Sequence, residues 1–296
     1  MFLEPTPLED LPAASLLKLD GAVTAEQFCD SDGDYKRKYN VYKLTAGGKS
    51  YVLKKSDHRE STVYRDFLQG RGFAVPAYWG SVEHEGAIWL LMEYIDGPDL
   101  RRFDREKALA CAETLSQIQN AYWKSPIDDG RFRRYWERVN RRAACLQGYP
   151  ELAKAYQLFL ARQEACPRTL CSGDFLQCNG ILRDGRVYMI DWAFGGLLPY
   201  ALDIARLIAH GPEKSEPDAF PFYMDAALRS AFVRAHYERL AHRPDWAQYV
   251  QDIKLAALNE YAEFLEVQIN DPETPREELE SGFYYRRAVE TAKAIL

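Results

Sequence analysis

The chain has 296 residues, of which 47% are hydrophobic and 13% aromatic, and its formal net charge is −6. This apolar content is enough for a substantial core in two lobes, which excludes a disordered protein. Acidic and basic residues are mostly intermixed, so the sequence lacks the broad cationic surface that binds nucleic acid.

Targeting signals are also absent from the sequence. No apolar stretch approaches the roughly 18 residues that a membrane span requires, and residues 1–20 lack the pattern of a signal peptide. The six cysteines form no CxxC pair, which argues against a zinc site or a disulfide scaffold. We therefore expect a cytoplasmic protein with no membrane partner.

The first hundred residues predict a small antiparallel sheet and one helix. Runs rich in β-forming residues occur at 39–45, 50–55 and 88–94. Gly47 and Gly48 mark a hairpin turn between the first two runs, and residues 84–86 mark a second turn. Residues 58–69 have helical spacing and are followed by Gly70 and Gly72, which favour a helix end.

Most of the sequence after Asp96-Gly97-Pro98 has helical spacing. Long aromatic-rich stretches of this kind lie at 105–123, 131–146, 151–165, 221–240 and 246–270. The predicted fold class is therefore α+β, with a small β-rich lobe followed by a larger, mainly helical one.

The segment from residue 172 to residue 192 contains the most informative motif. Asp174 and Asn179 lie in one loop, and an apolar run then ends at Asp191. Phosphoryl transfer needs a carboxylate that orients or deprotonates the acceptor hydroxyl, and oxygen ligands that hold magnesium against the nucleotide phosphates. Asp174 suits the first role, and Asn179 and Asp191 suit the second. Asp and Asn are also common in turns for local reasons, but chance rarely supplies the whole series.

These residues resemble the aminoglycoside phosphotransferase and choline kinase superfamily, whose loop usually reads HGDxxxxN and whose metal-binding aspartate is commonly followed by Trp or Phe. Here the loop reads SGDFLQCN from Ser172, Asp191 precedes Trp192, and residues 202–205 resemble the family's Asp-Leu-Ala segment.

The resemblance implies a two-lobed, protein-kinase-like fold. It places a nucleotide-binding lobe at residues 1–93 and a catalytic, acceptor-binding helical lobe at residues 94–296. It also implies an ATP-dependent small-molecule kinase that uses ATP and Mg²⁺ and phosphorylates a hydroxyl of an aminoglycoside, choline-like or sugar-like acceptor. Ser172 replaces the family's histidine, which is chiefly a scaffold residue. A catalytically weak or inactive kinase-fold protein that binds nucleotide or a protein partner therefore stays open as the alternative.

In this family a strand lysine holds the nucleotide phosphates and is paired with a helix glutamate. The matching residues are Lys54 and Glu60, with Lys55 and Asp66 as the alternatives. Strand alternation places Val52 on the same face as Lys54, where it would pack on adenine.

Glu93, Tyr94 and Ile95 resemble the family's hinge between the two lobes. The backbone groups of these residues would hydrogen-bond adenine. A phosphate-covering loop is expected at residues 31–35. That loop contains one glycine and two acidic residues, which would repel phosphate.

The acceptor-binding residues are left unassigned. The last part of the chain is rich in acidic and aromatic side chains, namely Glu260, Tyr261, Glu263, Phe264, Glu266, Asp271 and Glu273. Such residues suit a cationic acceptor, but they are also typical of an ordinary solvated helix face.

Overall fold

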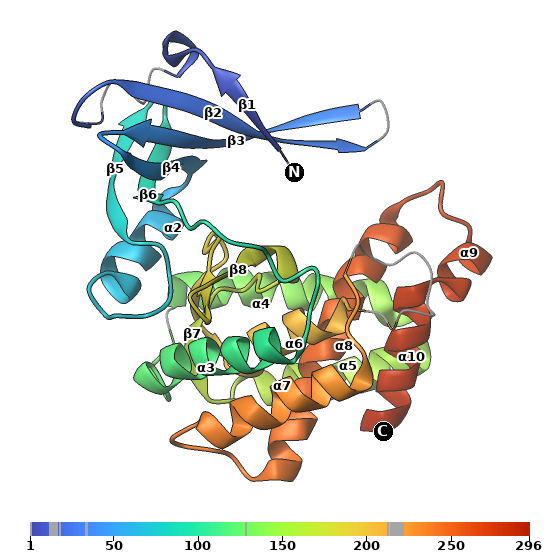
Figure 1. Ribbon diagram of the computed structural model, residues 1–296. Helices are drawn as coiled ribbons and strands as arrows, with labels where there is room; N and C mark the ends of the chain where they lie inside the picture. Colours follow the sequence, from blue (N-terminus) through green and yellow to red (C-terminus); the bar gives the residue numbers. More distant parts are fainter. Residues whose placement is uncertain are drawn as a thin grey trace. The chain divides into compact units, whose positions relative to one another are not determined.

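The computed structural model describes residues 2–11, 17, 19–32, 35–127, 129–211, 213 and 222–296. The chain divides into two compact units (Figure 1). Unit 1 comprises Met1–Gly97 and Ile190–Phe194, and unit 2 comprises Pro98–Met189 and Gly195–Leu296. The short return of the chain into unit 1 at Ile190–Phe194 was not predicted from the sequence.

Unit 1 contains a six-stranded antiparallel sheet with the strand order β1-β2-β3-β4-β6-β5. Its strands are β1 (Phe2–Thr6), β2 (Val23–Asp32), β3 (Tyr35–Ala46), β4 (Lys49–Ser56), β5 (Tyr78–His84) and β6 (Ala87–Glu93). The three predicted strands are confirmed as β3, β4 and β6. β1, β2 and β5 were not predicted, because side chains of both faces alternate along a strand and the polar face dilutes the apolar signal.

Both predicted hairpin turns are confirmed. β3 and β4 are joined at Gly47 and Gly48, whose φ values of 55° and 74° lie in the left-handed region that glycine adopts without strain. β5 and β6 are joined at Glu85 and Gly86, with φ values of 51° and 71°.

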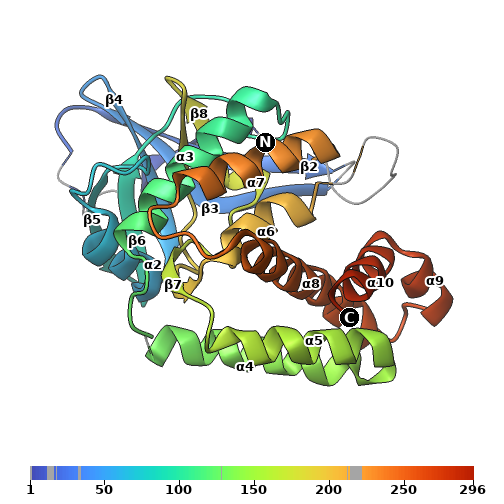
Figure 2. The ribbon, with the colours of Figure 1, turned by 90° about the horizontal axis from the view of Figure 1, so that it is seen from below.

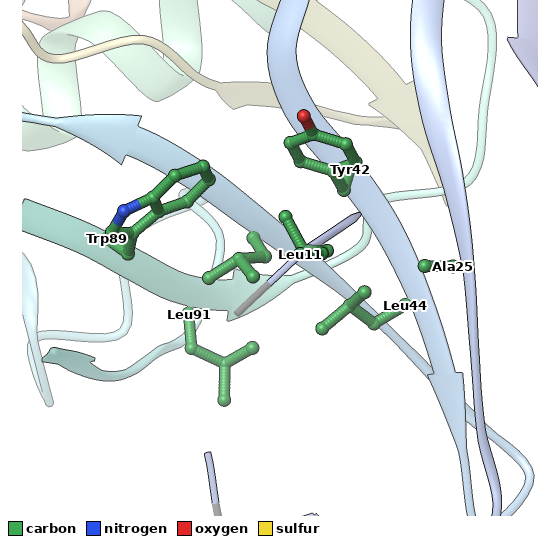
Figure 3. Packing of buried hydrophobic residues seen from close by; sticks show 7 residues of the cluster. Leu11, Ala25, Tyr42, Leu44, Trp89 and Leu91 are labelled. Carbon is green, nitrogen blue, oxygen red and sulfur yellow. The ribbon is translucent and has the colours of Figure 1, made fainter. Parts of the chain in front are cut away.

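One face of this sheet is covered by a cluster of buried apolar side chains (Figure 3). Leu53 of β4 lies opposite Leu91 of β6 and opposite Tyr42 of β3. Tyr42 also packs against Trp89, with ring centroids 6.1 Å apart. Leu11, from the segment before β2, completes the cluster at 2% exposure. Each leucine removed from water contributes about 1.5–3 kcal/mol to stability.

Helix α2 of unit 1 begins beside the end of β4. α2 spans His58–Val63 and continues as a wider π-helical turn, η2, over Tyr64–Leu68. Asp57 caps the helix, since its carboxylate accepts the amide N–H groups of Arg59 and Glu60. The predicted helix at 58–69 is therefore confirmed, and its cap places Glu60 in the first turn.

Unit 2 is mainly helical (Figures 1 and 2). Its helices are α3 (Arg105–Ala121), α4 (Asp129–Cys145), α5 (Pro150–Gln163), α6 (Ala201–Ala209), α7 (Ala226–Arg239), α8 (Trp246–Asn270), α9 (Arg276–Ser281) and α10 (Phe283–Ile295). The long helix α8 packs against α4, α5, α6, α9 and α10, and α3 packs against α7. Within the described parts of the chain, no helix combines the length and the apolar character that a membrane crossing needs.

Two antiparallel pairs of short strands flank the predicted catalytic loop. β7 (Arg168–Cys171) pairs with β10 (Gly196–Pro199), and β8 (Gly180–Arg183) pairs with β9 (Arg186–Met189). The catalytic loop leaves β7, and the chain reaches Asp191 directly after β9. The turn between β8 and β9 contains Asp184 and Gly185, both at positive φ.

The burial of Leu53 in the core of unit 1 leads to a prediction about the free energy of unfolding. Replacing Leu53, which is fully buried, in a Leu53→Ala variant is expected to reduce the free energy of unfolding by about 2–5 kcal/mol, because the substitution leaves a cavity. Urea unfolding followed by circular dichroism measures this change. Leu8→Ala is the matched control, since Leu8 is 39% exposed and should lose less than about 1 kcal/mol.

Candidate active site

The first group of functional residues lies within unit 1. Lys54 of β4 places its Nζ atom 2.9 Å from the carboxylate of Glu60 and 2.8 Å from Asp191 Oδ1. Lys55 is exposed, and Asp66 binds Arg65 on the surface. The structure therefore brings together Lys54, Glu60 and Asp191. Lys54 and Glu60 are the lysine and the glutamate that the sequence favoured over Lys55 and Asp66.

The Glu60 carboxylate is the centre of this group, and its side chain is fully buried. Besides Lys54 it accepts hydrogen bonds from Ser56 Oγ and from the Trp192 amide N–H, the latter at 3.1 Å. Ser56 was not predicted, although it lies two residues after Lys54 and so on the same face of β4. A buried carboxylate is tolerated because several donors satisfy it.

The ion pairs also fix the charge of Lys54. Burial disfavours the ammonium form, but the negative charges of Glu60 and Asp191 outweigh burial and raise the pKa of Lys54. The lysine therefore stays positively charged and can attract phosphate oxygens.

Asp191 has an unusual backbone conformation. Its φ of 59° lies in the left-handed region, which costs a residue other than glycine on the order of 1 kcal/mol or more. The next residue, Trp192, has no exposed side-chain surface and donates its amide to Glu60. These contacts hold the strained turn, and the Asp191 carboxylate keeps 40% exposure.

The predicted adenine-binding residues lie along β4 and β6. Val52 lies opposite Lys43 on one side and Met92 on the other. The amide N–H groups of Glu93 and Tyr94 already donate to the carbonyls of Ala77 and Ser50. Ile95 follows as a buried side chain. An adenine contact at this segment would therefore need backbone groups other than those two N–H groups.

The predicted phosphate-covering loop lies between β2 and β3. Its central residues, Gly33 and Asp34, lie outside the described residues. Of the basic residues that follow, Lys36 forms an ion pair with Glu4 of β1.

The second group of functional residues lies within unit 2, in the loop after β7. Gly173 has φ 72°, a turn that brings Asp174 into the loop. Asn179 ends a short 3₁₀ turn, η4 (Gln177–Asn179), and its Nδ2 atom donates to the Asp174 carbonyl at 2.7 Å and to Asp174 Oδ2 at 3.1 Å. Because its nitrogen is committed to Asp174, the Asn179 side chain would offer its oxygen to a metal.

Asp203 of α6 anchors this loop. Its carboxylate accepts the amide N–H groups of Ser172 and Gly173 at 2.7 and 2.9 Å, and the Ser172 hydroxyl at 3.3 Å. Burial raises the pKa of Asp203 to about 6, although these three hydrogen bonds favour the carboxylate and lower the pKa. The Ser172 hydroxyl also accepts the Asp174 amide N–H at 3.3 Å. Ser172 is fully buried and thus links Asp203 to Asp174.

Arg206 is a functional residue that the sequence analysis missed. Its Nε and Nη2 atoms donate to Asp174 Oδ1 at 2.9 and 2.7 Å, and Nη1 donates to Glu260 Oε2 at 2.7 Å. The available signal was its position three residues after Asp203, which places both side chains on one face of α6. Arg206 holds one oxygen of Asp174, while Asn179 contacts the other.

The charges around Arg206 stabilise one another. Burial disfavours the guanidinium, but Glu260, Glu263 and Asp174 outweigh it and raise the pKa of Arg206 further above its ordinary value. Burial would raise the pKa of Glu260, yet Arg206 and His210 lower it to about 2. Both groups therefore stay ionised in the folded protein.

The structure predicts a pH-dependent role for Glu260. Its folded pKa lies below its ordinary value of 4.5, so its stabilising contribution is present above pH 4.5 and is lost as the pH falls toward 2. The difference in unfolding free energy between wild type and Glu260→Gln should therefore shrink by about 1–3 kcal/mol from pH 5 to pH 3. Urea unfolding at several pH values measures it. Glu137→Gln, on the exposed face of α4, is the control, and equal pH dependence of both differences would contradict the assignment.

A second prediction concerns the charge of Arg206. Arg206→Met leaves the carboxylates of Asp174 and Glu260 without their shared cation, and we expect a loss of about 3–5 kcal/mol in unfolding free energy. Adding Glu260→Gln should recover part of this loss, because one buried charge is then removed. A double variant as unstable as the single one would show that Arg206 acts through packing rather than charge.

Comparison with known proteins connects these two groups to a family. The family model described as the phosphotransferase enzyme family matches residues 37–249, which is more than half of the chain. The chain belongs to this family. The matched range includes both groups of functional residues, and no curated protein matches the chain in sequence.

Solved phosphotransferase structures share the fold. A thermostable mutant of aminoglycoside phosphotransferase APH(4)-Ia, in ternary complex with AMP-PNP and hygromycin B, matches with a TM-score of 0.59 and 16% identity, covering 96% of this chain and 97% of the other. Plasmodium vivax ethanolamine kinase matches with a TM-score of 0.55 and 13% identity, covering 92% and 81%. An aminoglycoside phosphotransferase from Alicyclobacillus acidocaldarius matches at 0.51 and 17%, covering 98% and 95%. The predicted kinase-like fold is confirmed, and this chain shares it with aminoglycoside phosphotransferases and an ethanolamine kinase.

Proposed function

We propose that the protein is an ATP-dependent kinase that transfers the γ-phosphate to a hydroxyl of a small molecule. The main observation is the grouping of Lys54, Glu60 and Asp191 in one unit of a phosphotransferase-family chain. Asp174 and Asn179 are grouped in the other unit. Each group supplies one part of what phosphoryl transfer requires.

In this proposal the first group binds the nucleotide. Lys54 steadies the phosphates, and Glu60 keeps the lysine in place. Val52, Glu93, Tyr94 and Ile95 belong to the adenine-binding side, by resemblance to the family.

Asn179 and Asp191 would hold Mg²⁺, because carboxylate and amide oxygens are the donors that this ion prefers. When bound, Mg²⁺ neutralises charge on the nucleotide phosphates. Asp191 Oδ1 accepts a hydrogen bond from Lys54 Nζ at 2.8 Å. The carboxylate is partly exposed and so can be reached by a ligand.

Asp174 would orient the acceptor hydroxyl and accept its proton as the oxygen attacks the γ-phosphorus. Arg206 and Asn179 fix the orientation of the Asp174 carboxylate from both sides. A fixed carboxylate limits the positions that the hydroxyl can take, which favours in-line attack without a covalent enzyme intermediate.

The second candidate is a kinase-fold protein that binds nucleotide or a protein partner without turnover. The observation in its favour is Ser172, which stands where the family usually has histidine. Against it, Ser172 still connects Asp203 to the Asp174 backbone, so the loop keeps an anchor.

Nucleotide binding is tested by thermal shift with ATP, with and without Mg²⁺. We expect a Mg²⁺-dependent rise in melting temperature, since a ligand present at about 100 times its Kd stabilises the folded state by about 2.7 kcal/mol. The rise should disappear in Asp191→Ala and persist in the control Asp66→Ala, a surface position in the same unit. An unchanged melting temperature at millimolar ATP, in wild type, would argue against the kinase.

Turnover separates the two candidates. With a hydroxyl acceptor identified by ADP release, Asp174→Asn should lower kcat by about 10²–10⁴-fold while the Mg²⁺-dependent thermal shift with ATP stays intact. Full turnover in Asp174→Asn would overturn the role given to this residue. A wild type that binds Mg²⁺ and ATP but releases no ADP with any acceptor would favour the binding protein.

A further inference from the structure

The acidic residues of α8 are paired internally. Glu260, Glu263 and Glu266 lie three residues apart along this helix and therefore along one side of it. Glu260 and Glu266 are buried, with 5% and 8% exposure, so they do not form a solvated helix face.

Arginines of α4 bind two of these carboxylates. Arg142 Nη2 donates to Glu263 at 2.5 Å, and Arg142 Nε lies 3.5 Å from Glu266. Arg141 forms a further ion pair with Glu266. The Arg142 side chain is 7% exposed, so its charge is directed toward these acids and away from solvent.

The same network reaches the catalytic loop through Arg206. This guanidinium binds Asp174 and Glu260, and its Nη1 atom lies 3.6 Å from Glu263. An acceptor whose hydroxyl lies at Asp174 would therefore meet Glu260 and Glu263 already paired with cations.

A fourth arginine adds positive charge to the network. The pKa of Arg138, also on α4, is lowered by burial and by the positive charge of the neighbouring Arg142. Four arginines thus face four carboxylates, namely Arg138, Arg141, Arg142 and Arg206 with Asp174, Glu260, Glu263 and Glu266. Within this set of eight side chains the formal charges balance, unlike in an unpaired acidic cluster.

A balanced network disfavours an ammonium group. An ammonium group placed there meets carboxylates that are already bound to guanidiniums, so it gains no net attraction to offset the loss of its hydration. The aromatic neighbours give no compensation, because the Phe264 ring stacks on Tyr284 with centroids 4.2 Å apart, and Tyr261 is buried. Hydroxyl groups, in contrast, can bond to paired carboxylates and guanidiniums without disturbing the charge balance.

We propose that the acceptor is an uncharged polyhydroxyl compound, of the sugar or polyol class, and not a polycation. This inference rests on the proposed kinase function, since it takes Asp174 as the position of the acceptor hydroxyl. It assigns Arg142 and Arg206 the role of excluding cationic acceptors by occupying the acids that would bind them.

The test is a calorimetric titration of the full chain with hygromycin B as the polycation probe, at low and moderate salt. Wild type is expected to bind weakly, with Kd above about 1 mM. Arg142→Met removes one cation from Glu263 and Glu266, leaves Arg141 and Arg206 as their remaining cations, and should tighten binding at least about tenfold in a salt-sensitive manner. Arg141→Ala is a milder variant at a side chain that is 60% exposed, and it should produce a smaller gain. Arg133→Ala, exposed on the same helix, is the control and should leave binding unchanged.

Two results of the titration would overturn the inference. The first is salt-sensitive binding by wild type that weakens at least about tenfold in Glu263→Gln, since the acids would then be available to a polycation. The second is the absence of any gain in Arg142→Met and Arg141→Ala, when circular dichroism shows both variants folded.

The titration requires no turnover, so its outcome is separable from that of the kinase proposal. Loss of Mg²⁺-dependent ATP binding would refute the kinase and leave the measured charge preference standing. Phosphorylation of hygromycin B by wild type would support the kinase and refute the uncharged acceptor. In ADP-release assays we expect a higher kcat/KM for glucose than for the cationic sugar glucosamine or the anionic sugar glucuronate. A higher kcat/KM for either charged sugar would contradict the inference.

Discussion

The structure of unit 1 depends on one buried carboxylate. Glu60 has no exposed surface, and it binds the strand through Lys54 and Ser56 and the Ile190–Phe194 segment through the Trp192 amide. An ionised group in an apolar interior is tolerated only with such partners. Glu60 therefore determines where β4 ends relative to α2, and it determines the backbone position of Asp191. The proposed nucleotide site would depend on this fixed arrangement, because Lys54 and Asp191 must keep their positions to act on phosphates.

Unit 2 also depends on a buried carboxylate that accepts several hydrogen bonds, and here it belongs to Asp203. Asp203 accepts two backbone N–H groups of the catalytic loop, and Arg206, one turn later on α6, binds Asp174. One helix thus fixes both the backbone of the loop and the Asp174 carboxylate, the proposed catalytic group. In this arrangement Ser172 needs only to link Asp203 with the Asp174 amide, which a small hydroxyl achieves within a fully buried position. The family's histidine is replaced here without the loss of an anchor.

Much of this organisation could be predicted from the sequence, because its signals are local. Alternation along 50–55, helical spacing at 246–270 and the turn chemistry of Gly47 and Gly48 each depend on neighbouring residues. The Lys54–Glu60 pair followed from strand alternation and the resemblance together. The functional roles of the site residues stay predictions.

What the sequence could not supply was long-range pairing. Arg206 and Glu260 are far apart in the chain, and neither has a local pattern that identifies the other. The acidic residues of α8 could be interpreted either as a cation site or as a solvated face, and the structure shows them bound by arginines of α4 and α6. Whether a charged residue on a helix faces solvent or binds another residue is decided by its neighbours in space, which the local sequence does not give.

The interrupted chain path of unit 1 affects how the protein is made. Residues 1–97 leave the ribosome before Ile190–Phe194 has been synthesised, and the delay spans about 90 residues. At a synthesis rate of about 5–20 residues per second, this is on the order of ten seconds. During that time the newly made sheet has Glu60 without the Trp192 amide and Lys54 without Asp191. Unit 1 can therefore reach its final state only after most of unit 2 has been translated, and a nascent chain released early would lack these partners of Glu60 and Lys54.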